Sequence, residues 1–161
     1  MKEKIITVKG LVKKYGDFTA VKGLDFEVER GEIFGLLGPN GAGKSTTLEI
    51  IETLRKKTEG EITVGGFDLD KESSKIRHII GVQLQASGYY PGLNLKELIH
   101  LFAGLYNKKV NPIDILDLVN LREKASAKYK QLSGGQQQRF SIATTLINQP
   151  QIIFLDEPTT G

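Results

Sequence analysis

Hydrophobic and polar residues alternate along two early stretches of the chain. Residues 5–15 and 20–29, the latter reading AVKGLDFEVE, place apolar side chains at nearly every second position. This period of two predicts antiparallel strands with one buried face and one face in water. Residues 32–37 (EIFGLL) are apolar on both faces, which predicts a buried central strand.

Helical spacing appears next. Leu48, Ile51 and Leu54 share one stripe, so we expect a helix over residues 44–56. Residues 61–64 predict a short strand before a Gly-Gly turn at 65–66, and residues 79–84 predict another strand.

The pattern becomes mainly helical after residue 93. Residues 94–97 (NLKE) form a predicted capping box, followed by apolar residues at helical spacing. Asn111 and Pro112 predict a second helix start. We therefore expect one domain over residues 1–161, in which a helical part, 94–129, is inserted between β and α/β core segments, 1–93 and 130–161.

Composition adds three limits to this picture. The 161 residues are 39% hydrophobic and 25% charged, which is typical of a globular domain with a core. The net charge of +3 comes from interspersed Lys, Arg, Asp and Glu, so no nucleic-acid partner is expected. The absence of Cys excludes disulfides, and neither a signal peptide nor a membrane span is recognisable.

The stretch GPNGAGKST, residues 38–46, matches the phosphate-binding loop pattern. Its glycines allow backbone N–H groups to point at phosphate oxygens, and the following helix adds the positive end of its dipole. We expect Lys44 to reach the β- and γ-phosphates and Ser45 to ligate Mg²⁺. The alternative is a plain glycine-rich turn. The residues expected to contact the nucleotide here are Gly38, Asn40, Gly41, Ala42, Gly43, Lys44, Ser45 and Thr46.

A second site is predicted at the end of the chain. The apolar residues 152–155 are followed directly by Asp156 and Glu157, which predicts a buried strand with two carboxylates at its carboxyl end. Asp156 is expected to hold the Mg²⁺ shell, and Glu157 suits a general base that orients water. The alternative is an ordinary strand followed by an Asp-Glu-Pro turn.

The pentapeptide LSGGQ, residues 132–136, opens another predicted helix, with Phe140, Ala143 and Ile147 on one face. Ser133 is a natural N-cap, and the two glycines leave backbone N–H groups unobstructed. Such a helix terminus binds anions, although a glycine-rich helix start without a ligand would look similar. The residues expected to contact a phosphate are Ser133, Gly135 and Gln136.

These three motifs together resemble those of ABC-type ATPases, the nucleotide-binding subunits of ABC transporters. GPNGAGKST is similar to the family's Walker A motif, IIFLDEP to Walker B, and LSGGQQQR to the signature. The resemblance covers residues 8–161. It implies an α/β P-loop fold of the ABC type, with an antiparallel β subdomain, a mainly parallel core sheet and a helical insertion.

The resemblance also implies roles for single residues. Two subunits would pack head to tail, so that each signature touches the γ-phosphate bound by the other. Tyr15 matches the aromatic residue that stacks on adenine, the alternative being a tyrosine packed in the core. Gln85 matches the glutamine that contacts Mg²⁺ and the attacking water, with Gln83, two residues earlier on the same strand face, as second choice. His78 and His100 have no metal-ligand spacing.

Part of the family pattern is missing. In the family, TTG is followed by Leu-Asp and then by a further strand that ends in a histidine at the γ-phosphate, and neither follows here. We therefore expect a C-terminally truncated ABC ATPase whose core sheet is incomplete. We expect it to hydrolyse ATP barely or not at all, and to be poorly packed or oligomeric.

The leading functional hypothesis is a transport motor of the export or multidrug type. The intact parent would bind MgATP, hydrolyse it as a dimer and drive a separate transmembrane permease, docked near residues 89–93. It would lie in the cytoplasm, on the inner face of the membrane. Two alternatives remain: a soluble ABC ATPase that acts on ribosomes or DNA, and a regulator that binds nucleotide without hydrolysis. The absence of heptads and the presence of Lys44, Asp156 and Glu157 count against them.

Overall fold

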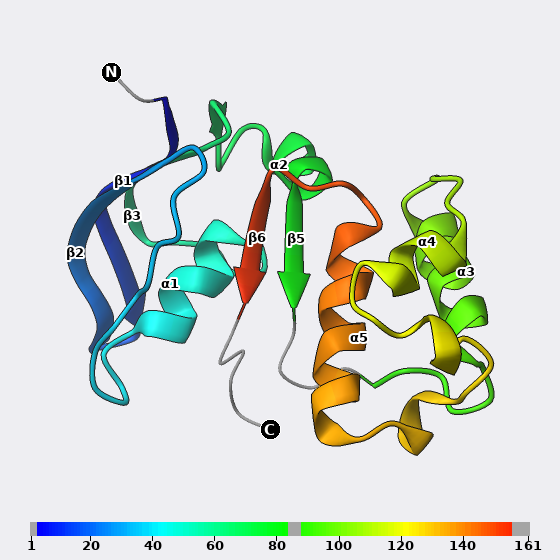
Figure 1. The fold of residues 1–161 in the computed structure, drawn as a ribbon. Helices are drawn as coiled ribbons and strands as arrows, with labels where there is room; N and C mark the ends of the chain where they lie inside the picture. Colours follow the sequence, from blue (N-terminus) through cyan, green and yellow to red (C-terminus); the bar gives the residue numbers. More distant parts are fainter. Residues whose placement is uncertain (1–2, 84–87, 156–161) are drawn as a thin grey trace. The chain divides into compact units, whose positions relative to one another are not determined.

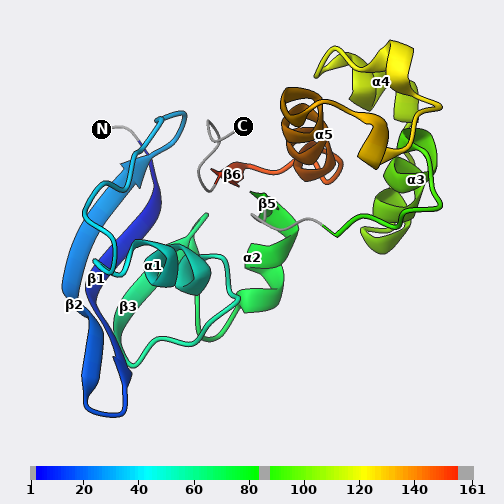
Figure 2. The ribbon, with the colours of Figure 1, turned by 90° about the horizontal axis from the view of Figure 1, so that it is seen from below.

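The computed structural model describes residues 3–83 and 88–155. The chain forms two compact units, Met1–Ile80 and Gly81–Gly161, and each has its own core. Figures 1 and 2 show the elements of each unit in chain order. Within the described ranges no helix is long and apolar enough to cross a membrane.

The first unit is built on a four-stranded antiparallel sheet. Its strands are β1 (Lys4–Tyr15), β2 (Phe18–Glu29), β3 (Glu59–Val64) and β4 (Phe67–Asp68), in the order β2-β1-β3-β4. The two early alternating stretches therefore form antiparallel strands, as predicted, and they pair with each other. The strand at 61–64 and the Gly65–Gly66 turn, with φ of 58° and 81°, are also confirmed. Alternate residues such as Ile6, Val8 and Ile62 are buried, which explains the period of two.

Two helices complete this unit: α1 (Lys44–Ile51), which lies on one face of the sheet, and α2 (Ser73–Ile79). The predicted helix over 44–56 is too long, because the chain turns at Thr53, whose φ is 65°. The Leu54 amide donates to the Glu49 carbonyl at 2.8 Å and the Thr53 amide to the Ile50 carbonyl at 3.0 Å. This is the hydrogen-bond pattern of a Schellman helix end, and it leaves Leu54 exposed.

The prediction of a buried central strand over residues 32–37 is wrong. No strand lies between β2 and α1 in the element order, and Ile33 and Leu37 are 100% and 92% exposed. An apolar pattern on both faces predicts burial only if neighbouring strands cover it and complete its ladder. No strand of the described chain pairs with this segment, so it remains irregular.

The second unit contains two strands and three α-helices in its described part. The strands β5 (Ile80–Gln83) and β6 (Ile152–Leu155) pair, and Figure 1 shows both arrows pointing the same way. The strand predicted over 79–84 is confirmed for residues 80–83, whereas Ile79 ends α2 and Leu84 lies outside the described residues. The helices are α3 (Leu95–Leu105), α4 (Pro112–Asp117) and α5 (Gly134–Leu146), with short 3₁₀ turns at Arg122–Lys124 and Tyr129–Gln131.

The predicted helix starts of this unit are confirmed. The Asn94 side chain accepts from the Glu97 amide at 3.1 Å, while the Glu97 carboxylate accepts from the Asn94 amide at 2.8 Å. Asn111 caps α4 by accepting from the Ile113 amide at 3.1 Å. These local contacts satisfy amides that a helix end leaves unpaired, which explains why the sequence locates the starts well.

One further correction concerns β6. The sequence predicts a buried strand over 152–155, but only Phe154 is buried, while Ile153 and Leu155 are 43% and 39% exposed. Side chains at alternate positions of a strand face opposite sides. The described chain therefore covers one face of β6 and leaves the other partly in solvent.

Candidate functional site

The glycine loop of the first unit is shaped by left-handed backbone positions. Gly41 and Gly43 both have φ near 82°, a conformation that L side chains rarely adopt. Gly43 is also the N-cap residue of α1, and a Cβ atom there would lie 2.5 Å from the Ala20 carbonyl oxygen of β2. Glycine is therefore required at position 43 for two reasons, conformation and close approach to the sheet.

Lys44 lies across this loop. Its ammonium donates hydrogen bonds to the carbonyl oxygens of Gly38, at 2.8 Å, and Pro39, at 2.9 Å. These contacts hold a full positive charge inside the curve of the loop, beside the N-terminus of α1. The described first turn of α1 carries no acidic residue, so the positive helix end is not neutralised there. This arrangement favours a multiply charged anion.

Ser45 and Thr46 follow in the first turn of α1, Ser45 exposed and Thr46 half-buried. A magnesium ion at this place would need more oxygen ligands than one hydroxyl supplies. Among the described residues no group of three or more His, Asp or Glu could hold a metal ion. The Ser45 hydroxyl therefore fits Mg²⁺ only as one ligand of a shell that phosphate oxygens and other groups complete.

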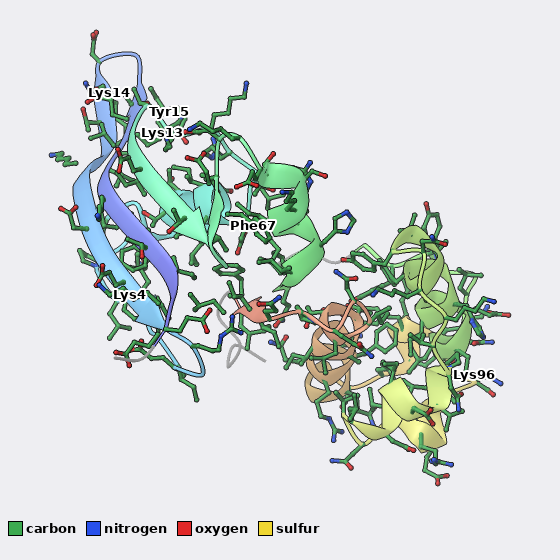
Figure 3. The ribbon with its side chains drawn as sticks, turned by 90° about the horizontal axis from the view of Figure 1, so that it is seen from above. Lys4, Lys13, Lys14, Tyr15, Phe67 and Lys96 are labelled. Atoms are coloured by element: carbon green, nitrogen blue, oxygen red, sulfur yellow. The ribbon has the colours of Figure 1, made fainter. Side chains whose placement is uncertain are left out.

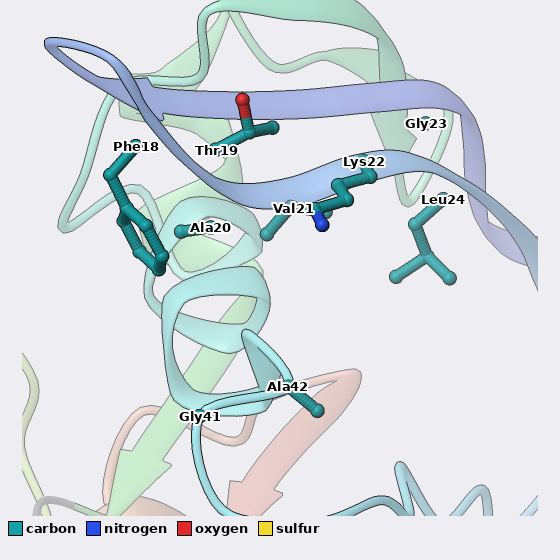
Figure 4. A pocket seen from close by; sticks show the side chains of 9 residues that line it. All are labelled: Phe18, Thr19, Ala20, Val21, Lys22, Gly23, Leu24, Gly41 and Ala42. Atoms are coloured by element: carbon teal, nitrogen blue, oxygen red, sulfur yellow. The ribbon is translucent and has the colours of Figure 1, made fainter.

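A hollow of about 410 Å³ adjoins the loop. Figure 4 shows it between β2 and the turn that leads into α1. The residues that line it are Phe18, Thr19, Ala20, Val21, Lys22, Gly23, Leu24, Gly41 and Ala42. Because Gly41 and Ala42 also belong to the glycine loop, a ligand whose anionic end binds the loop can extend into this hollow.

Tyr15 ends β1 and is 41% exposed, so the alternative of a core tyrosine is wrong. The Lys13 ammonium lies 4.9 Å from the centre of its ring and the Arg55 guanidinium 5.5 Å. Figure 3 shows Lys13 and Tyr15 at the same end of the hairpin. A hydrogen bond to Glu49 raises the pKa of Arg55, so the group beside the ring remains a cation. The assignment of Tyr15 to adenine stays a prediction.

The signature segment starts α5 in the second unit. The Ser133 hydroxyl accepts from the Gln136 amide at 3.4 Å, and the Gln136 side chain accepts from the Ser133 amide at 3.0 Å. The predicted N-cap is therefore confirmed, and Gly134 and Gly135 are exposed. Whether Ser133, Gly135 and Gln136 contact a phosphate stays a prediction.

Replacing Ser133 with alanine should lower the free energy of unfolding by about 0.5–2 kcal/mol, because an N-cap hydroxyl is lost. Urea denaturation followed by circular dichroism measures this change. Ser126 is the matched control, since it is an exposed serine outside the helices, and its alanine variant should stay within about 0.5 kcal/mol of the wild type. Equal midpoints for both variants would show that the cap does not stabilise α5.

Several predicted site residues fall outside the described part of the chain: Gln85, Asp156 and Glu157. Gln83, the second choice for the glutamine, is buried, and its side-chain oxygen accepts no hydrogen bond within the described structure. His78 and His100 are exposed. The sequence reasoning missed the residues of β2 that line the hollow. No local pattern indicates them, because the residues of β2 and the glycine loop that line the hollow are far apart in the sequence.

The loop, its lysine and the start of α1 have the form of a P-loop, the phosphate-binding loop that the sequence predicts. A profile of the family described as "ABC transporter" matches residues 21–160. The linearmycin resistance ATP-binding protein LnrL of Bacillus subtilis is 38% identical over 98% of this chain and 52% of its own. The probable multidrug ABC transporter ATP-binding protein YbhF of Escherichia coli is 40% identical over 99% of this chain and 28% of its own.

A solved structure supports the same assignment. It is the dimeric post-hydrolysis state of the ATP-binding cassette MJ0796 bound to ADP and Pi, with a TM-score of 0.81 and 34% identity over 96% of this chain and 74% of that one. The chain therefore belongs to the ABC transporter family, as the three motifs predict. It spans about half the length of LnrL and less of YbhF.

Proposed function

We propose that this chain is the nucleotide-binding part of an export-type ABC transporter and that it binds MgATP. The observation that carries the proposal is the Lys44 ammonium, held inside the glycine loop by the carbonyls of Gly38 and Pro39. A triphosphate carries anionic oxygens. The Lys44 ammonium, the loop amides and the helix N-terminus would all bind such oxygens. Ser45 and Asp156 would hold the magnesium ion, which neutralises phosphate charge.

The remaining roles follow the family resemblance. Glu157 would orient the attacking water as general base, and Gln85 would contact both the water and the metal. Tyr15 would meet the adenine ring. Ser133, Gly135 and Gln136 would contact the γ-phosphate bound by a second subunit, in a head-to-tail dimer. The names of the relatives support this subunit role, since LnrL and YbhF are both ATP-binding proteins.

Hydrolysis and transport belong, in this proposal, to a longer protein and its partners. A separate transmembrane permease would couple ATP hydrolysis to transport. It would also hold the ATPase at the inner face of the cell membrane. The resistance and multidrug names of the relatives favour export of a small organic compound.

Lys44→Ala should weaken binding of MgATP about 10- to 150-fold, because a hydrogen-bonded charge facing the phosphates is lost. Isothermal titration calorimetry of the 161-residue chain measures this affinity. Lys124→Ala is the control, since Lys124 is an exposed lysine in the second unit and its removal changes the net charge by the same amount. Wild-type chain that binds no nucleotide, or equal affinities for Lys44→Ala and Lys124→Ala, would contradict the proposal.

A further inference from the structure

The glycine loop holds the only asparagine of the sequence that is followed directly by a glycine, in the pair Asn40–Gly41. The two residues form the centre of a turn, because the Ala42 amide donates to the Pro39 carbonyl at 3.2 Å. Gly41 is left-handed, with a φ of 82°, and both residues of the pair are exposed. Solvent therefore reaches this pair.

The backbone nitrogen of Gly41 is well placed to react with the side chain before it. Among the described residues, the Gly41 amide donates no hydrogen bond. An added Cβ at this position would meet nothing within 4 Å, so no neighbouring group packs against it. Glycine also has wide backbone freedom and no side chain that would hinder its own nitrogen. Under these conditions a backbone nitrogen can attack the side-chain carbonyl carbon of the preceding asparagine.

Two other asparagines provide an internal comparison. Asn107 and Asn120 are exposed and left-handed, with φ of 51° and 54°. The amide that follows Asn107 donates a hydrogen bond at 2.8 Å, and the amide that follows Asn120 donates one at 2.9 Å. The following residues, a lysine and a leucine, also carry side chains. Both nitrogens are therefore less available than that of Gly41.

We infer that Asn40 is a deamidation site whose modification closes the nucleotide site. The Gly41 nitrogen forms a bond to Asn40 Cγ and gives its proton to solvent. The bond between Cγ and Nδ2 breaks, and the side-chain nitrogen takes a proton from solvent and leaves as ammonia. Water then opens the resulting succinimide ring at either carbonyl, which gives aspartate or isoaspartate. The sequence of steps needs water alone, because nothing is oxidised or reduced.

Either product opposes phosphate binding. Both carry a carboxylate in place of the neutral Asn40 amide, in the loop whose carbonyls hold the Lys44 ammonium. Isoaspartate also adds a carbon atom to the main chain, which displaces the loop amides that would bind phosphate. This part of the inference rests on the proposed function. Bound phosphates would in turn engage the loop amides, so nucleotide should protect Asn40.

Peptide mapping by mass spectrometry tests the modification after incubation of the whole chain in mildly alkaline buffer. Asn40 should lose its amide at least ~10-fold faster than Asn107 or Asn120 in the same molecules, a barrier difference of about 1.4 kcal/mol. Saturating MgATP should slow the loss at Asn40 and leave the other two rates unchanged. Asn40→Gln should abolish the loss, because the longer side chain would have to form a larger ring.

Calorimetry tests the consequence for the nucleotide site. Asn40→Asp reproduces one of the two products and should weaken MgATP binding roughly tenfold or more, because its added negative charge repels the phosphates. Asn107→Asp is the control, since it adds the same charge at an exposed position outside the glycine loop. Its affinity for MgATP should stay within about twofold of the wild-type value, because exposed distant charges are screened by salt.

The outcomes separate this inference from the proposed function. Equal rates of amide loss at Asn40, Asn107 and Asn120 overturn the modification site. In a chain that binds MgATP, an unchanged affinity of Asn40→Asp or a rate at Asn40 that nucleotide does not slow overturns the link to the nucleotide site. Wild-type chain that binds no MgATP overturns the proposed function, while the comparison of the three rates still decides whether Asn40 is modified.

Discussion

Replacing Phe140 with alanine should lower the free energy of unfolding by about 3–5 kcal/mol, the range seen for large aromatic side chains in a core. Phe140 is fully buried on α5, where its ring lies 5.2 Å from that of Tyr89 and 5.9 Å from that of Tyr129. Alanine would leave a cavity among these rings, which cannot close without moving α3 or α5. Urea denaturation followed by circular dichroism measures the loss.

The same variant should change the acidity of a neighbour. Burial raises the pKa of the Tyr129 hydroxyl, with a smaller contribution from Tyr89. Opening the core beside Tyr129 should let water in and lower this pKa toward the ordinary tyrosine value, which an ultraviolet titration of phenolate detects. Arg139→Ala is the control, because Arg139 precedes Phe140 but is exposed, and it should change stability by no more than about 0.5 kcal/mol. Similar losses in both variants would show that Phe140 does not organise this core.

Local signals in the sequence predicted much of the fold. The hairpin of β1 and β2 follows from alternation, since each strand is the immediate neighbour of the other in the chain. The starts of α3, α4 and α5 follow from Asn94, Asn111 and Ser133, whose side chains cap amides only two or three residues away. Interactions this short are contained in the sequence window that predicts them.

The errors arise where structure depends on distant partners. Residues 32–37 and the exposed face of β6 have the composition of buried strands, but burial also requires a neighbour, which a local pattern cannot supply. The end of α1 was missed for a different reason. A left-handed Thr53 replaces the glycine that usually ends such a helix, so the usual stop signal is absent.

In the candidate site, too, the features that depend on consecutive residues are predictable from the sequence, and those that depend on distant residues are not. The glycine loop and Lys44 were found at once, because loop-forming and phosphate-binding residues are consecutive. Phe18 was not found, because its relation to Gly41 and Ala42 comes from the packing of β2 against a loop more than twenty residues later. Only a three-dimensional structure places that ring beside the loop.

Gly43→Ala should lower the free energy of unfolding by about 2–5 kcal/mol and weaken MgATP binding at least tenfold. A left-handed alanine costs about 1–2 kcal/mol, and overpacking against fixed neighbours adds about 1–3 kcal/mol. The new Cβ would lie 2.5 Å from the Ala20 carbonyl oxygen and 3.0 Å from a Val21 methyl group. The loop and the start of α1 would have to move away from β2, so the amides would no longer converge on a phosphate. Denaturation and calorimetry measure the two effects.

Gly41 offers a matched control for this prediction, because its φ is also 82° but an added Cβ would meet nothing within 4 Å. Gly41→Ala should therefore cost only the backbone strain, about 1–2 kcal/mol. The difference between the two variants isolates the contact between Gly43 and β2 from the conformational preference that both glycines share. If Gly41→Ala were as destabilising as Gly43→Ala, the fit of the loop against the sheet would not be what holds it in shape. If Gly43→Ala instead lost stability but kept its affinity for ATP, this loop would not be the part of the chain that binds the phosphates.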